Sequence, residues 1–311
     1  MDKERYFLPS IPQPIPYQGS KRAIADEILE FAPTRLERIV EPFAGSAALS
    51  ITAALRGRAK RFLLNDLNAP LMALMDQIVN HPNEIGDRYT SIWQAQTGRT
   101  KAYYNEVREE FNRTHDPGLL LYLLARCVKA SVRYNASGDF NQGPDNRRLG
   151  RRPSSMRQEI SAVSRLLIGK TEITSLDYRA LLDRIDPGAD FVYMDPPYQG
   201  TSTTRDPRYF SSLNVHDLIL FLERLNHQGV MYALSYDGHK AGKAYGIALP
   251  DRLSLLRFEI NAGRSSQSTL LGRDQTTYES LYLSPTLANA LNATNLVNTP
   301  IVVQPIQYAL L

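Results

Sequence analysis

The sequence predicts an α/β fold in which a doubly wound, largely parallel sheet is interrupted by a mostly helical insertion. A strand, a glycine turn, a helix and a second strand follow one another between residues 38 and 65. Strand and helix patterns alternate again between residues 166 and 283, whereas residues 69–130 are mostly helical by periodicity. Strands that alternate with helices are typical of a doubly wound sheet.

The first part of the chain contains four expected elements. Residues 20–31 have the pattern of an amphipathic helix, with Ser20 as its cap. Residues 38–42 predict a buried strand that runs into a turn at Gly45, and residues 47–55 predict the helix that follows it. Residues 61–65 predict a second strand, which completes a unit of the nucleotide-binding type.

The later elements follow an irregular segment. Residues 133–157 lose periodicity and are rich in Gly, Asn, Pro and Arg, which predicts a long surface loop with a function. Beyond it we expect helices at 155–168 and 215–228, and strands at 172–175, 191–194, 230–235, 255–260 and 278–283. Residues 286–311 have no pattern that we can interpret.

Composition excludes several classes of protein. The chain has 311 residues, of which 43% are hydrophobic and 22% charged, and it has no apolar run long enough to span a membrane. The charged N-terminus predicts no export signal. Cys127 is the single cysteine and the five histidines have no metal-ligand spacing, so we expect a reducing cytoplasm, no disulfide and no metal.

Basic residues are concentrated in the middle of the chain. The net charge is +4, yet residues 126–157 hold eight basic residues and only two acidic ones. The rest of the chain is slightly acidic, with 28 basic and 30 acidic residues. This distribution predicts a polyanion such as nucleic acid at one face, although a solvated loop would have the same composition.

The segment Asp195-Pro196-Pro197-Tyr198 directly follows the apolar strand at 191–194. In an open α/β sheet, ligands bind beyond the carboxyl ends of the strands. Two prolines stiffen the backbone, so the Asp195 carboxylate and the Pro196 carbonyl can converge on one point. Both are acceptors, and a primary amino group is their natural partner. The alternative is a proline turn in which Asp195 is only a cap.

This arrangement suits methylation of an amine conjugated to an aromatic ring, such as N6 of adenine. The nitrogen lone pair is delocalised, so the amine is a poor nucleophile. Two acceptors on its hydrogens favour a tetrahedral nitrogen and stabilise the positive charge that grows as it attacks a sulfonium methyl group. Tyr198 offers a ring on which an extruded base can stack, an interaction worth about 1–3 kcal/mol.

A second motif, Glu41-Pro42-Phe43-Ala44-Gly45-Ser46, lies at the first strand–helix turn. Gly45 lets a ligand approach the backbone, and the following helix N-terminus offers free N–H groups to a carboxylate. Asp66 follows Gly45 by 21 residues, the usual offset of an acid that binds ribose hydroxyls. The pair predicts an adenosine-containing ligand, although Asp66 could instead cap a helix that begins near Ala69.

Taken in order, these motifs resemble those of the Dam-type DNA adenine-N6 methyltransferases, the alpha group. The segments that carry the resemblance are Pro16-Tyr17-Gln18-Gly19-Ser20-Lys21, EPFAGSAAL at 41–49, Asp66-Leu67-Asn68 and DPPY at 195–198. Residues 103–112 resemble the segment at the start of target recognition, and residues 133–141 resemble the DNA-reading hairpin. Leu176-Asp177-Tyr178 occupies the place of the pair that touches the cofactor adenine.

The resemblance, from about residue 14 to 285, implies a Rossmann-like methyltransferase sheet with a mostly helical target-recognition insertion. The S-adenosylmethionine-binding catalytic domain would comprise residues 1–68 and 166–285, and the insertion residues 69–165. Double-stranded DNA is the implied partner, with a cognate restriction endonuclease left open. The tail at 286–311 has no counterpart.

The resemblance also implies roles for matching residues. The cofactor pocket would contain Tyr17, Lys21, Glu41, Phe43, Gly45, Ser46, Asp66 at the ribose, and Asp177 with Tyr178 at the adenine. Asp195, Pro196 and Tyr198 would hold the target base. DNA contacts would come from Arg133 and Asn135 in the hairpin, from Arg147, Arg148, Arg151 and Arg152 at phosphates, and from Arg264 in a later loop.

The sequence departs from the family at two places and leaves alternatives open. Ala47 stands where the turn commonly has a second glycine, and the loop after Asn141 diverges, so the GATC target is not implied. The alternatives are methylation of cytosine N4 or of an amide, a nicotinamide-dependent oxidoreductase, and an inactive DNA-binding protein. The turn lacks a full G-x-G-x-x-G, which disfavours the oxidoreductase.

Overall fold

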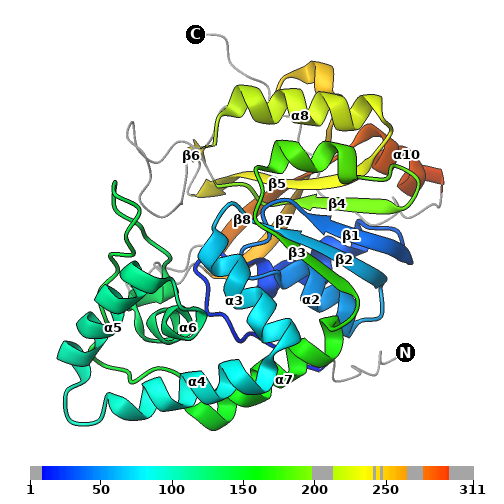
Figure 1. Ribbon diagram of the computed structural model, residues 1–311. Coiled ribbons are helices and arrows are strands. Elements are labelled where there is room, and N and C mark those ends of the chain that lie inside the picture. The colour runs from blue at the N-terminus through cyan, green and yellow to red at the C-terminus, as the bar shows by residue number, and fades with distance from the viewer. Residues whose placement is uncertain (1–8, 198–212, 241–242, 246–247, 265–275, 294–311) are drawn as a thin grey trace, which may run out of the picture.

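A computed structural model describes residues 9–197, 213–240, 243–245, 248–264 and 276–293. At its centre is a sheet with the strand order β3-β2-β1-β4-β5-β8-β7, in which β6 pairs with β5 (Figure 1). Strands β1 to β5 pair in parallel, and β8 is antiparallel to both of its neighbours. The strands are β1 Leu36–Glu41, β2 Ala59–Asn65, β3 Thr171–Thr174, β4 Asp190–Met194, β5 Met231–Lys240, β6 Lys243–Tyr245, β7 Leu256–Arg264 and β8 Thr276–Leu283.

Helices cover both faces of the sheet, which confirms the predicted α/β fold class. They are η1 Lys21–Ile24, α1 Ala25–Glu30, α2 Ala48–Leu55, α3 Ala69–Asn80, α4 Pro82–Ala95, α5 Thr100–Thr114, α6 Pro117–Arg126, η2 Val128–Ala130, α7 Pro153–Leu167, η3 Tyr178–Arg184, α8 Val215–His227, η4 Asp251–Leu253 and α10 Pro285–Ala293.

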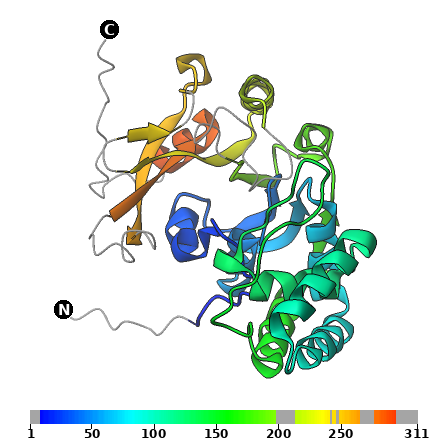
Figure 2. The same ribbon diagram turned by 90° about the vertical axis from the view of Figure 1, so that its left-hand side faces the viewer.

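Alternate residues of each strand supply two separate cores. Ile39 and Phe191 pack with α1 and α2, whereas Val40 and Val192 pack with η3 and α8. The helices on the two sides of the sheet can be seen in Figure 2. The period of two along each strand places neighbouring residues on opposite faces. Both faces of β1 and β4 are therefore packed against helices at these positions, as expected for the central strands of a parallel sheet.

The order of the parallel strands reverses between β1 and β4. Here the connections leave the sheet toward opposite faces, so the carboxyl ends of these strands frame a crevice. The helices α3 to α7 lie together beside the sheet (Figure 1), in the part of the chain expected to be a helical insertion. The domain boundaries themselves stay a prediction.

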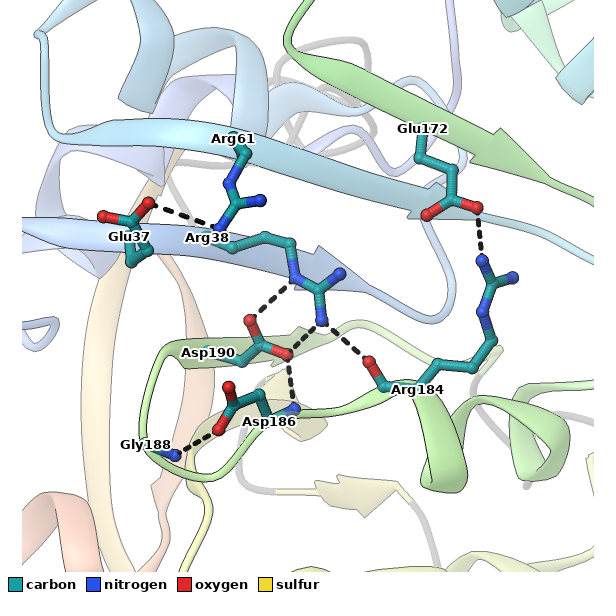
Figure 3. A network of polar contacts seen from close by, with 8 residues as sticks. All are labelled: Glu37, Arg38, Arg61, Glu172, Arg184, Asp186, Gly188 and Asp190. Carbon is teal, nitrogen blue, oxygen red and sulfur yellow. Dashed lines mark hydrogen bonds and ion pairs between the residues drawn. The ribbon is translucent and has the colours of Figure 1, made fainter.

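At the opposite side of the sheet, where the parallel strands begin, a charged network joins β1 to β4 (Figure 3). Arg38 and Asp190 are paired in the register of β1 and β4. The Arg38 guanidinium donates to both Asp190 carboxylate oxygens, at 2.7 and 2.6 Å, and also to the Arg184 carbonyl. Asp190 is 1% exposed, so this bidentate pair satisfies an otherwise costly buried charge.

Three expectations about elements are wrong in detail. Residues 20–31 form a 3₁₀ turn followed by a short α-helix, and Ser20 makes no side-chain cap. Its hydroxyl instead accepts a hydrogen bond from Ser46 Oγ at 3.1 Å, because the chain turns here toward the glycine loop. The helix after the glycine loop begins at Ala48, because Ala47 is left-handed.

The start of the tail, whose sequence pattern predicted no element, contains a helix. Residues 285–293 form α10, and its Leu287 is fully buried against the sheet core. Residues 294–311 lie outside the described part. Among the described residues, no helix combines the length and the apolarity needed to cross a bilayer.

Candidate active site

A cavity of about 210 Å³ lies at the carboxyl ends of β1, β2 and β4, at the point where the strand order reverses. It is lined by all nine residues expected at the cofactor and by two expected at the target base: Tyr17, Lys21, Glu41, Phe43, Gly45, Ser46, Asp66, Asp177, Tyr178, Asp195 and Pro196. Tyr198 lies outside the described residues. Segments far apart in the sequence thus meet in one place.

The glycine turn has a left-handed backbone at two positions. Gly45 has φ +52°, and a side chain there would begin 3.4 Å from the Tyr17 ring. Ala47 has φ +54° and is fully buried. The position where a second glycine is usual therefore does adopt a conformation that costs an alanine about 1–2 kcal/mol. The methyl group nevertheless fits into the core.

Asp66 connects this turn to the next segment. Its carboxylate accepts from Gly45 N at 2.9 Å and from Asn68 N at 3.0 Å. The alternative that Asp66 caps helix α3 is wrong, because the Asn68 side chain is the cap and accepts from Leu71 N. Burial raises the pKa of Asp66. Its role at a ribose stays a prediction.

Glu41 ends β1 beneath the cavity and is 3% exposed. Its Oε1 accepts from Ser50 N at 2.8 Å, in the first turn of α2. Burial raises the pKa of Glu41 to about 7, and the negative charge of Asp195 acts in the same direction. A buried acid of this kind gains from a cation placed nearby.

Asp195 follows β4 and is paired with a buried ammonium. Lys21 Nζ lies 3.1 Å from Asp195 Oδ1 and 3.2 Å from Glu279 Oε2. Burial raises the pKa of Asp195 to about 6. The positive charge of Lys21 lowers this pKa, whereas the negative charge of Glu279 raises it. Asp195 is therefore mostly ionised at neutral pH. Lys21 lines the cavity as expected, but its charge is directed toward the acid rather than into open space.

Aromatic rings line another part of the cavity. Phe43 and Tyr178 lie 4.9 Å apart between ring centroids, and Phe221 packs edge-on behind Tyr178. Such rings suit a planar heterocycle. The Asp177 carboxylate is bound in a bidentate manner by Arg179, which also contacts Asp217 on α8. Asp177 thus has a structural partner, and its expected contact with an adenine stays a prediction.

Residues 133–141 do form a hairpin-like loop beside the cavity. Tyr134 and Phe140 form an antiparallel bridge. The Asn135 carboxamide accepts from Ser137 N and Asp139 N and donates to Asp139, so it holds the turn together. This geometry assigns Asn135 a structural role and does not support the base contact expected for it.

The hairpin is attached to the cavity rim at two points on its N-terminal side. Ala130, just before the hairpin, accepts from Gln18 N at 2.9 Å. The Tyr134 hydroxyl donates to Asn68 Oδ1 at 3.3 Å. Gln18 and Asn68 both line the cavity. Arg133 lies between these attachments and is half-buried, with its Nε 3.3 Å from Ser131 Oγ.

The expectation of one basic surface is wrong for part of the arginine run. Arg126 is 2% exposed and donates to Gln96 inside the insertion. Arg151 donates to the Gln13 carbonyl and pairs with Glu159, which favours a structural role over a phosphate contact. Tertiary packing, which a charge count ignores, turns these side chains inward.

The other arginines expected at phosphates are exposed, and their DNA contacts stay a prediction. Arg147 and Arg148 have side chains that are 86% and 68% exposed, and both pair with the Asp145 carboxylate. Arg152 is exposed at the start of α7. Arg264 ends β7, and its side chain lies outside the described part.

The structure adds residues that the sequence reasoning missed. Glu279 in β8 contacts Lys21, and Asn68 and Asp217 line the cavity. A signal for Glu279 does exist, since it is an acid in phase with the buried Leu281 and Leu283. No local signal marks Asp217, which is one of several polar residues on an amphipathic helix.

The fold and the cavity together define a class of protein. A mostly parallel sheet with a ligand cavity at its switch point, a glycine turn, a strand-end acid and a second acid followed by two prolines is the arrangement of an α/β methyltransferase that acts on an amino group.

Comparison with known proteins defines the family. The family model for D12 class N6 adenine-specific DNA methyltransferases matches residues 17–244, and the chain belongs to this family. Type II methyltransferase M.MjaIII of Methanocaldococcus jannaschii is 24% identical over 255 residues, which are 74% of this chain and 86% of the relative. The DNA adenine methylase of Escherichia coli K12 is 27% identical over 208 residues, 66% of this chain and 68% of the relative. Retron Ec67 DNA adenine methylase of Escherichia coli is 29% identical, and the match covers 68% of this chain and 73% of the relative.

These findings confirm the predicted family and activity. The protein is an adenine-specific DNA methyltransferase, its substrate is DNA, and its methyl donor is S-adenosylmethionine, as in this family. The alternative of a nicotinamide-dependent oxidoreductase is therefore dropped. The roles of individual residues are a separate question.

Proposed function

We propose that the chain methylates N6 of an adenine that leaves the duplex and enters the cavity, where Asp195 binds its amino group. One observation carries this proposal. The Asp195 carboxylate, fixed at the end of β4, lines the same cavity as the glycine turn and Asp66. A donor site and an acceptor site for the methyl group therefore share one cavity.

The residues of the cavity fit S-adenosylmethionine. Gly45 leaves room beside the Tyr17 ring, and the Phe43 and Tyr178 rings offer apolar faces to an adenine. Glu41 and Asp195 are buried acids whose pKa values are raised, which a cationic sulfonium would relieve. When bound, the cofactor supplies an electrophilic methyl group on positively charged sulfur.

Asp195 and the Pro196 carbonyl would accept the two hydrogens of the adenine amine. An ionised carboxylate is acceptor-only, so it accepts a hydrogen of the amine and stabilises the positive charge that grows on nitrogen. Loss of one aimed group of this kind typically costs about 10²–10³ in rate. The transfer is direct, without a covalent enzyme intermediate. A base inside the stack is inaccessible to this cavity, so we include base flipping in the proposal.

The hairpin at 133–141 and the exposed Arg147, Arg148 and Arg152 would contact the duplex. Some relatives are named type II methyltransferases or, for StsI of Streptococcus sanguinis, a modification methylase. We therefore include a cognate restriction endonuclease as a system partner. Because the named relatives come from bacteria and an archaeon, we propose that the chain acts in the cytoplasm of a prokaryotic cell.

The test is methyl transfer by Asp195→Ala. We expect no detectable N6-methyladenine in plasmid DNA, whereas S-adenosylmethionine still binds by calorimetry. Asp87→Ala is a matched control, because the Asp87 side chain is 71% exposed and lies on α4. Single-molecule sequencing of the methylated DNA gives the base and its context together. A near-wild-type rate for Asp195→Ala would remove the basis of the proposal.

A further inference from the structure

Glu279 occupies an unusual position for an acid. It lies on β8 in phase with Leu281 and Leu283, which are 1% and 0% exposed and belong to the sheet core. Its own side chain is 21% exposed. An uncompensated carboxylate in such a row is costly, so its partner matters.

The sheet is irregular beside Glu279. In the pairing of β5 with β8, Ser235 is opposite Leu281, but Glu279 is opposite Gly238, so the register shifts between the two positions. A bulge of this kind re-aims side chains, and bulges are frequent next to active sites. Here the carboxylate reaches Lys21 on η1, at 3.2 Å.

Lys21 connects Glu279 to the proposed catalytic group. The Lys21 side chain is 7% exposed, and its ammonium lies 3.1 Å from Asp195 Oδ1 on its other side. An ammonium carries three donors, so it can hold two carboxylates at once. One oxygen of Asp195 is thereby fixed from η1, and the plane of the carboxylate is fixed with it.

We propose that Glu279 is a positioning residue for methyl transfer, which holds the Lys21 ammonium and through it orients the Asp195 carboxylate toward the substrate amine. This inference rests on the proposed role of Asp195. Without Glu279, Lys21 would lose one of the two carboxylates that hold its ammonium. The ammonium would then compete with the adenine amine for the same lone pairs.

Two effects of Glu279→Gln follow. The kcat should fall by about 10- to 100-fold, the range of a lost hydrogen bond to a charged group, while KM for S-adenosylmethionine changes by less than about twofold. The acid limb of the kcat profile should also move to lower pH, because the Glu279 charge raises the pKa of Asp195. The charged groups that act on Asp195 among the described residues are Lys21 on η1, Glu279 on β8 and Glu41 on β1.

Lys21→Met should shift the acid limb of the kcat profile in the opposite direction. Lys21 lowers the pKa of Asp195, so its removal should move the acid limb to higher pH. Glu279→Asp keeps the charge on a shorter side chain, so it should restore the wild-type acid limb and part of kcat. A merely structural role for Glu279 would produce neither the two opposite shifts nor this rescue.

The matched control is Glu259→Gln, which removes an acid from the neighbouring strand β7, where the Glu259 side chain is 41% exposed. We expect wild-type kinetics for it. All variants are assayed as full-length chains with saturating duplex DNA, after cofactor binding has been measured by calorimetry. If Glu279→Gln does not fold, the positions of the acid limbs in the kcat profiles of Glu279→Asp and Lys21→Met test the proposal instead.

The outcomes distinguish a failure of the proposed role of Asp195 from a failure of the proposed role of Glu279. Activity in Asp195→Ala would overturn the proposed function itself. An inactive Asp195→Ala together with wild-type kcat and acid limb in Glu279→Gln would overturn only the role of Glu279. Equal displacement of the acid limb in the same direction by Glu279→Gln and Lys21→Met would also overturn it.

Discussion

Replacement of Glu41 by glutamine should make the free chain more stable in neutral solution. Glu41 is buried beneath the cavity, and one of its oxygens accepts from Ser50 N at the start of α2. Glutamine keeps that acceptor and nearly the same volume, but it carries no charge. The variant therefore isolates the cost of the buried negative charge.

The magnitude follows from the pKa of Glu41, which burial raises from 4.5 to about 7. One unit corresponds to about 1.4 kcal/mol, so the shift amounts to about 3 kcal/mol. The folded chain binds the proton more tightly than the unfolded chain does. The stability from this group is thus fully present below pH 4.5 and is lost as the pH rises through about 7. Glu41→Gln should match the wild type in acid and exceed it by as much as about 3 kcal/mol near pH 8.

Urea unfolding followed by circular dichroism, without cofactor, measures this difference between about pH 5 and pH 8. Glu84→Gln serves as control, because the Glu84 side chain is 72% exposed. The wild type should also bind S-adenosylmethionine more tightly as the pH rises through 7, since a cation favours the ionised Glu41, and the variant should lose this dependence. A stability difference that is the same at every pH would refute the reasoning.

Three further predictions concern other parts of the molecule. Gly45→Ala forces a left-handed alanine beside the cavity, so we expect about 1 kcal/mol lower stability and about tenfold weaker cofactor binding by calorimetry; unchanged binding would place the ligand elsewhere. Arg38→Met leaves the buried Asp190 carboxylate without its bidentate partner and should cost about 3 kcal/mol in urea unfolding. Adding Asp190→Asn should recover part of this loss, and a further loss would contradict the argument. Asp145→Asn removes the acid that two exposed arginines share, so DNA affinity should rise and its logarithmic salt slope should steepen by about 1 in fluorescence anisotropy; an unchanged slope would show that those arginines do not reach phosphates.

The central sheet could be predicted because its signals are local. Apolar residues are consecutive in the second half of β2 and in β4, and a glycine turn after β1, an acid after β2 and a pair of prolines after β4 mark where these strands meet the ligand edge. The topology of such sheets then brings the carboxyl ends together. Residues separated widely in the chain, such as Gly45 and Asp195, could therefore be assigned to one cavity from the sequence.

Directions of polar side chains could not be predicted in the same way. Arg126 and Arg147 look equivalent in a count of charge, yet Arg126 ends the apolar helix α6 and is buried, whereas Arg147 is exposed. Glu279 reaches Lys21 only because β8 lies next to a bulged β5 and faces η1. These contacts depend on tertiary packing and strand register, which a single sequence does not specify locally.

The two attachments between the hairpin and the cavity rim limit how target specificity can change. Gln18 holds the chain before the hairpin, and Asn68 holds Tyr134 at its base. A chimaera that takes residues 135–139 from another family member leaves both attachments intact, so it exchanges the tip of the loop alone. A crossover placed before Tyr134 keeps the Gln18 contact, because backbone atoms make it, but it keeps the Asn68 contact only if the incoming residue at 134 is again a tyrosine. Exchange of the loop tip is therefore the way to alter target choice that disturbs the cavity rim least.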